Sequence, residues 1–130
     1  MKNVLLLFLS DIHLKRDSTN FQYTRYKDFE NYLCVQTNES AIYKLVQHLK
    51  AEGKQLDAVF YFATKLTQKK LKVTVDGKEF SKTQEDWFKT CVRYNLEKED
   101  KGDDTVADYE KELVRFIERC VDKNDAEKDT

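Results

Sequence analysis

The fold prediction rests on TNESAIYKLVQHLKAEGKQLDAVFYFAT, residues 37–64, which predicts a helix followed by a strand. Its first part has apolar side chains at the i, i+3, i+4 and i+7 spacing of an amphipathic helix, namely Ile42, Leu45, Val46 and Leu49. Thr37 or Asn38 is expected to cap the start of this helix, and Gly53 to close its end. The apolar run at 56–64 then predicts a strand.

A second apolar run lies at the start of the chain, over residues 1–9. Its core is too short to span a membrane, and no cleavage-site pattern follows it. Short, continuously apolar strands are typical of parallel sheets whose two faces are both covered by helices. Residues 31–36 suggest another strand before the helix. We therefore predict that residues 4–9 and 56–64 form adjacent parallel strands, each covered on both faces.

The rest of the chain predicts a hairpin and two helices. Residues 15–26 form a polar stretch that indicates a functional loop, and Asp76-Gly77 suits the turn of a hairpin over residues 70–80. Ser81 and Gln84 form a capping box before a helix. The apolar positions of that helix and of a later one are Trp87, Phe88, Cys91 and Val92, and then Val106, Tyr109, Leu113, Phe116, Ile117 and Cys120.

These elements predict an α/β fold, a Rossmann-like parallel sheet flanked by helices, with a β-hairpin insertion. Residues 97–104 are expected to be a charged linker, and residues 123–130 a polar tail. A doubly wound domain normally continues into further strands after such a helix. Residues 1–122 are therefore expected to be one domain that is incomplete at its C-terminal side.

Charge and cysteine content exclude some functions. The 23 Lys and Arg residues nearly balance the 24 Asp and Glu residues, so no general nucleic-acid binding is expected. The three cysteines (Cys34, Cys91 and Cys120) are widely spaced among apolar residues and form no C-x-x-C motif. Buried free thiols are the favoured interpretation, and they suit a reducing cytoplasm.

The segment LLLFLSDIHL, residues 5–14, ends in an Asp11-x-His13 pair like the first motif of calcineurin-like metallophosphoesterases. A two-metal site needs more ligands, including a Gly-Asp after the next long strand and a later Gly-Asn-His. Here that strand is followed by a lysine, no Gly-Asn-His exists, and His48 lies on a helix as a surface or boundary residue. There is also no Walker loop and no G-x-G-x-x-G motif. We predict no metal, no cofactor and no catalytic residues.

Three polar clusters remain at the predicted strand ends. They are Ser10, Asp11 and Ile12; Gln36, Thr37, Asn38 and Glu39; and Ala63, Thr64 and Lys65. Ligands of open parallel sheets bind beyond the carboxyl ends of the strands, and helix N-termini attract phosphate. The alternative is that the second cluster only caps its helix and that the nearby lysines form a solvated face.

The series VLLLFLS, VQTNESAIYKLV and LDAVFYFATK, with the later DWFK, resembles the N-terminal part of a CRISPR-associated Rossmann-fold (CARF) sensor domain. The resemblance covers residues 2–94, and it implies a homodimer that binds a cyclic oligoadenylate and controls a C-terminal effector of a type III CRISPR system. By this resemblance Ser10 and Asp11 would lie against the ligand, Thr37, Asn38 and Glu39 would contact ribose, phosphate or adenine, and Thr64 and Lys65 would flank a phosphate. Slow cleavage of the ligand is a known property of some such domains.

Two features depart from that family pattern. Many members have a Gly-Thr-like pair where this chain has Ser10-Asp11, and many have a further strand that this chain lacks. Two other functions therefore stay open. One is an α/β protein–protein interaction module without a small ligand, and the other is a hydrolase that acts on phosphodiesters.

Overall fold

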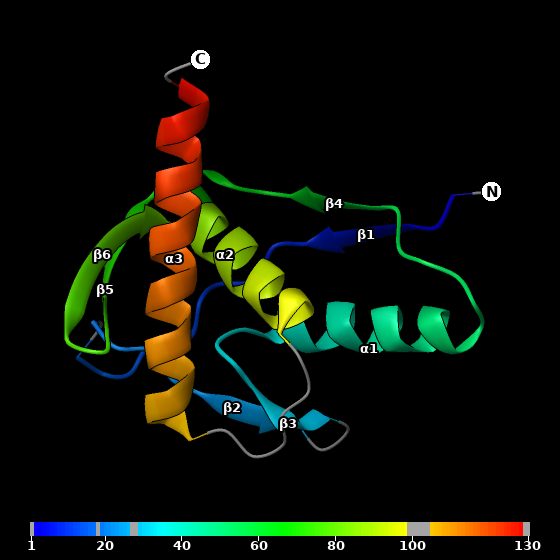
Figure 1. The fold of residues 1–130 in the computed structure, drawn as a ribbon, viewed down its shortest axis with the longest axis horizontal. Helices are drawn as coiled ribbons and strands as arrows, with labels where there is room; N and C mark the ends of the chain where they lie inside the picture. Colours follow the sequence, from blue (N-terminus) through cyan, green and yellow to red (C-terminus); the bar gives the residue numbers. More distant parts are fainter. Residues whose placement is uncertain (1, 18, 27–28, 99–104, 129–130) are drawn as a thin grey trace.

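The computed structural model describes residues 2–17, 19–26, 29–98 and 105–128. They form a mixed α/β fold of helices and small two-stranded sheets (Figure 1). In chain order the elements are β1 (Val4–Phe8), β2 (Thr24–Tyr26), β3 (Phe29–Cys34), α1 (Thr37–Ala51), β4 (Ala58–Phe62), the short 3₁₀ helix η1 (Lys65–Gln68), β5 (Lys70–Val75), β6 (Lys78–Thr83), α2 (Gln84–Glu97) and α3 (Val106–Lys128).

The predicted parallel pair is present. β1 pairs with β4 in a register that runs from Val4 opposite Ala58 to Phe8 opposite Phe62. The Leu9 amide extends the ladder by donating to the Phe62 carbonyl at 3.1 Å. The two strands therefore end at the same edge, as the sequence predicted, and α1 leads into β4 as the helix between them.

The expectation that helices cover both faces of these strands is wrong for the described residues. Leu5, Leu7 and Tyr61 are half-buried on the side of α1 and α2, where Tyr61 packs against Phe88 at 5.4 Å between ring centroids. The opposite face is exposed, with Leu6 at 66% and Phe8 at 79%. The physical reason is that α1 and α2 pack against one another and lie on the same side of the pair (Figure 1).

The main core lies elsewhere, between α2, α3, β5 and the chain around β3. Its largest fully buried side chains include Trp87, Tyr109 and Phe21. The ring of Phe21 meets that of Trp87 edge to face at 5.1 Å. Residues 15–26 are therefore not simply a polar loop, because Phe21 forms an antiparallel β-bridge with Leu14 and its side chain is buried in the core.

A doubly wound sheet is not seen in the described residues. The predicted strand over residues 31–36 is β3, but β3 pairs antiparallel with β2 and not with β1. Among the described residues the parallel sheet consists of β1 and β4. The coarse class, mixed α/β with a parallel pair, is confirmed, whereas the Rossmann-like arrangement stays a prediction.

The predicted hairpin is β5 and β6, which pair antiparallel around Asp76 and Gly77. Both turn residues have positive φ, 49° and 76°, as a two-residue turn of this kind requires. Gly53 also has a positive φ of 71° and closes α1, as expected.

Several predicted helix ends differ from the structure. The N-cap of α1 is Gln36, without a side-chain cap bond, instead of Thr37 or Asn38. The N-cap of α2 is Thr83, whose hydroxyl accepts from the Asp86 amide at 3.1 Å, instead of Ser81. α3 continues to Lys128, so most of the expected polar tail is helical, and residues 129–130 lie outside the described residues. The predicted linker falls largely on residues 99–104, also outside them.

Within the described parts of the chain, none of the helices is long and apolar enough to cross a membrane.

Candidate functional site

Asn38 joins the first two polar clusters. Its Oδ1 accepts a hydrogen bond from the Ser10 amide at 2.7 Å, and its Nδ2 donates to the Phe8 carbonyl at 3.2 Å. The Asn38 side-chain amide therefore satisfies two backbone groups at the end of β1. On this side of β1, none of the described strands pairs with it. This places the start of α1 directly beside the carboxyl end of β1.

Gln36 adds a second link between the same segments. Its Nε2 donates to the Ser10 carbonyl at 2.8 Å, and the side chain is fully buried. The Val35 carbonyl accepts from the His13 amide at 2.7 Å just beyond. The chain after β1 thus runs along the segment that precedes α1, and this contact is what brings Ser10 and Gln36 together.

The third cluster follows β4 at the same edge. Thr64 is exposed, and its amide donates to Oγ1 of Thr67, which in turn donates to the Thr64 carbonyl at 2.6 Å. These bonds fix the turn into η1 and leave Lys65 exposed at its first position.

Gln84, at the start of α2, connects this turn to the first cluster. Its Oε1 accepts from the Ile12 amide at 3.1 Å, and its Nε2 donates to the Leu66 carbonyl at 3.4 Å. The sequence had suggested a capping role for Gln84, and nothing in its spacing signalled this bridge. The structure therefore adds Gln84 to the residues that shape the edge.

The candidate residues divide into a surface set and a buried set. The exposed members are Asp11, Thr37, Ala63, Thr64 and Lys65, and Ser10 is half-buried. The buried members are Ile12, Gln36, Asn38 and Glu39, with Asn38 at 9% exposure. A ligand at this edge would meet the first set, while the second set holds the edge in shape.

Glu39 points into the protein, away from the edge. Its Oε2 accepts from the Val35 amide at 3.1 Å and from Nδ2 of Asn95 at 3.2 Å. Among the described residues its Oε1 has no hydrogen-bond partner. Burial raises the pKa of this carboxyl to about 8, although the bonds from Val35, Asn95 and the neighbouring thiols act in the opposite direction. Glu39 is therefore protonated over much of the acidic and neutral range.

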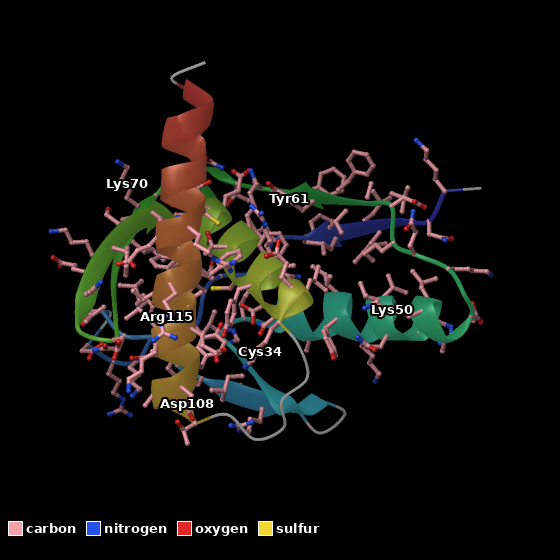
Figure 2. The ribbon with its side chains drawn as sticks, in the orientation of Figure 1. Cys34, Lys50, Tyr61, Lys70, Asp108 and Arg115 are labelled. Atoms are coloured by element: carbon pink, nitrogen blue, oxygen red, sulfur yellow. The ribbon has the colours of Figure 1, made fainter. Side chains whose placement is uncertain are left out.

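The thiols beside Glu39 share its environment. Cys34 and Cys91 are both free and fully buried, and burial raises the pKa of each thiol (Figure 2 labels Cys34). Cys120 is also free and is partly buried. The prediction of buried free thiols is confirmed for Cys34 and Cys91. A protonated thiol is a poor nucleophile, so these two cysteines act as small core side chains.

A polar group outside the predicted set lies on the α2 side of β4. Tyr61, labelled in Figure 2, donates from its hydroxyl to Oε1 of Glu85 at 2.6 Å. This bond holds the pKa of the Glu85 carboxyl below its usual range, and Lys89 forms an ion pair with the same oxygen at 3.4 Å. Gln68 donates to the other carboxylate oxygen, so the group ties η1 to α2.

Asp11 and His13 form the pair that resembles the first metal-binding motif of the metallophosphoesterases. Asp11 is exposed, His13 is half-buried, and within the described residues no group of three or more His, Cys, Asp or Glu side chains is arranged to hold a metal ion. His48 lies on the surface and contacts Glu52 at 3.6 Å, as its helix position predicted.

Comparison with protein-family models, curated proteins and solved structures finds no match for this chain.

Proposed function

We propose that this chain is a sensor domain that binds a cyclic oligoadenylate across a homodimer and controls an effector. One observation carries the proposal: Ser10, Thr37, Thr64 and Lys65 all lie at the edge where the parallel strands β1 and β4 end. Such an edge is where open parallel sheets bind ligands. The order of these residues along the chain is the one on which the resemblance to CARF domains rests.

The chemistry of the exposed set suits a phosphorylated ligand. Lys65 supplies a cation, Thr37 and Thr64 supply hydroxyls, and the start of α1 supplies the positive end of a helix dipole. The Asp11 carboxylate disfavours a phosphate nearby and instead suits a ribose 2′-hydroxyl or an adenine amine. The three free thiols favour action in the cytoplasm.

Titration calorimetry with cyclic tri-, tetra- and hexa-adenylate tests the proposal. We expect one ring to bind per two chains, with Lys65→Ala weakening binding and lowering the slope of log K against log salt by about two, since each of the two copies loses one phosphate contact. Lys111→Ala is the matched control, because it removes another exposed lysine, one that lies on α3 and outside the three candidate clusters. Absence of binding with every ring, or equal effects of both substitutions, would refute the proposal.

Asn38 is not a suitable probe of ligand contact. Its side chain holds the end of β1, so Asn38→Ala would disturb the edge itself and confound affinity with folding.

A protein–protein interaction module is the second candidate, and the exposed apolar face of β1 and β4 favours it. If no cyclic oligoadenylate binds while that face still associates with another protein surface, this second function is the better account.

A further inference from the structure

The outer face of β1 and β4 is an apolar surface that the described residues leave bare. Its members are the alternate residues of the two strands, Val4, Leu6, Phe8, Phe60 and Phe62, with exposures of 48%, 66%, 79%, 58% and 60%. Because side chains alternate across a strand, all five point to the same side. We call this surface the outer face. None of the five carries a charge or a hydrogen-bonding group.

The outer face is comparable in size with the largest apolar patch on a typical monomer. Phe8 and Phe62 stand together, with ring centroids 5.4 Å apart. An aromatic side chain has roughly 150–250 Å² of surface. The three phenylalanines are each more than half exposed. They therefore leave on the order of 300–500 Å² in solvent, before Val4 and Leu6 are added. The largest apolar patch on a typical monomer is about 300–600 Å², and a standard interface uses about 800 Å² per partner.

The absence of charge on the outer face suits a second copy as its partner. A two-fold interface brings a surface against itself, so it must be self-complementary. A strand pair whose exposed side carries no charge meets that condition, because no like charges are brought together. Two such faces pack as stacked sheets, about 10 Å apart with their strands nearly aligned. Two such faces together bury roughly 1,000 Å², which is the lower limit for a specific interface.

The exposed apolar area of β1 is greatest at the end of the strand where the polar clusters begin, and packing in the same direction sets these parts of the two copies against each other. Exposure rises from 48% at Val4 to 79% at Phe8, towards the end where the polar clusters begin. The apolar contact is therefore largest beside Ser10 and Lys65. A two-fold axis that runs along the strands keeps the strands of both copies in the same direction, so both carboxyl edges meet.

We propose that two copies of this chain pack through the outer faces of β1 and β4 with their strands in the same direction. The packing covers the bare face and brings the two candidate edges together, about one sheet spacing apart. The inference deepens the proposed function, since it names the surface that forms the homodimer. The role of the joined edges in ligand binding rests on the proposed function.

Sedimentation velocity over a wide range of protein concentration tests the interface. Wild-type protein is expected to dimerise, and Phe62→Lys is expected to raise the dimer Kd by roughly a hundredfold or more, because two like charges would be buried face to face. Val106→Lys is the control, since Val106 is a 41% exposed apolar residue on α3. A wild-type monomer at every concentration, or equal Kd values for Phe62→Lys and wild type, overturns the proposal. Circular dichroism must show that both variants are folded.

Cross-linking tests the orientation. In a Cys120→Ser background, Phe8→Cys is expected to link to Phe8→Cys through a short bis-maleimide, because same-direction strands hold the two residues near one another. Links that form only between Val4→Cys and Phe8→Cys in a mixture would show opposed strands and overturn the orientation. The ligand titration separates the two ideas. Dimerisation through the outer face without ligand binding refutes the function alone, and ligand binding with an unchanged dimer in Phe62→Lys refutes the interface alone.

Discussion

At the scale of single residues, the most unusual group is the buried acid Glu39. It was expected to contact a ligand, yet its carboxyl lies in the interior between the Val35 amide, Asn95 and two thiols. A buried carboxylate is costly unless its charge is compensated, and no cation is among these neighbours. The proton that Glu39 retains up to about pH 8 removes that cost.

This pKa predicts how stability varies with pH. The carboxyl of an unfolded chain has a pKa of about 4.5, so between pH 4.5 and about 8 the folded state holds a proton that the unfolded state has lost. The stability that the folded state gains from holding this proton is therefore complete below about pH 4.5, and it disappears as the pH rises to about 8. We expect wild-type protein to lose on the order of 3–5 kcal/mol over that range relative to Glu39→Gln, which keeps a neutral side chain of the same shape.

Urea unfolding at several pH values checks this expectation. The difference in unfolding free energy between wild type and Glu39→Gln should move in favour of the variant as the pH rises. Asp11→Asn serves as the control, because it removes a carboxyl group that is exposed to solvent instead of buried. A difference that does not change between pH 5 and 8 would show that Glu39 is ionised when buried.

The candidate residues illustrate what a single sequence can predict. The sequence correctly indicated that polar residues follow both parallel strands, because an apolar run that ends in polar residues marks a strand end. It could not show that Asn38 and Gln36 turn inward to satisfy Phe8 and Ser10, since that depends on how closely α1 approaches β1. Gln84 was missed for the same reason, as its two partners lie far away in sequence.

At the scale of secondary-structure elements, local patterns predicted the kind of element well and its ends less well. Asp76 and Gly77 fixed the turn of β5 and β6, because few residues adopt positive φ without strain. The start of α2 was ambiguous, because Ser81 and Thr83 are both good caps. The strand β6 continues to Thr83, and this extension excludes Ser81 from the cap position.

Cap substitutions in α2 test this assignment. Thr83→Ala should lower the unfolding free energy by about 1 kcal/mol, since the Asp86 amide loses its acceptor at the helix start. Ser81→Ala is the matched control and should change it by less than about 0.5 kcal/mol, because Ser81 is exposed on β6. Chemical denaturation of both variants decides between the caps. A larger loss of unfolding free energy for Ser81→Ala would show that Ser81 is the N-cap, as the sequence suggested.

At the scale of the whole molecule, the apolar side chains of the described residues are buried to very different degrees in two regions. The core around Trp87, Tyr109 and Phe21 is closed, whereas the strand pair is covered on one side only. Sequence reasoning placed the core around the strands because their runs are the most apolar. It failed because hydrophobicity does not say which partner covers a side chain, and both helices nearest the pair lie on the same face (Figure 1).

This division predicts a large contrast between two phenylalanines. Phe21 is fully buried and packs against Trp87 and Tyr23, so Phe21→Ala should cost about 3–5 kcal/mol through lost contacts and a cavity. Phe60 is 58% exposed, and Phe60→Ala should cost less than about 1 kcal/mol in the separate chain. Urea unfolding at the lowest usable protein concentration makes the comparison, because pairing of copies then contributes least. Equal losses would mean that the outer face is as well covered as the core, contrary to the exposures of its side chains. A loss for Phe60→Ala that grows with protein concentration would instead be the signature of a face that two copies share.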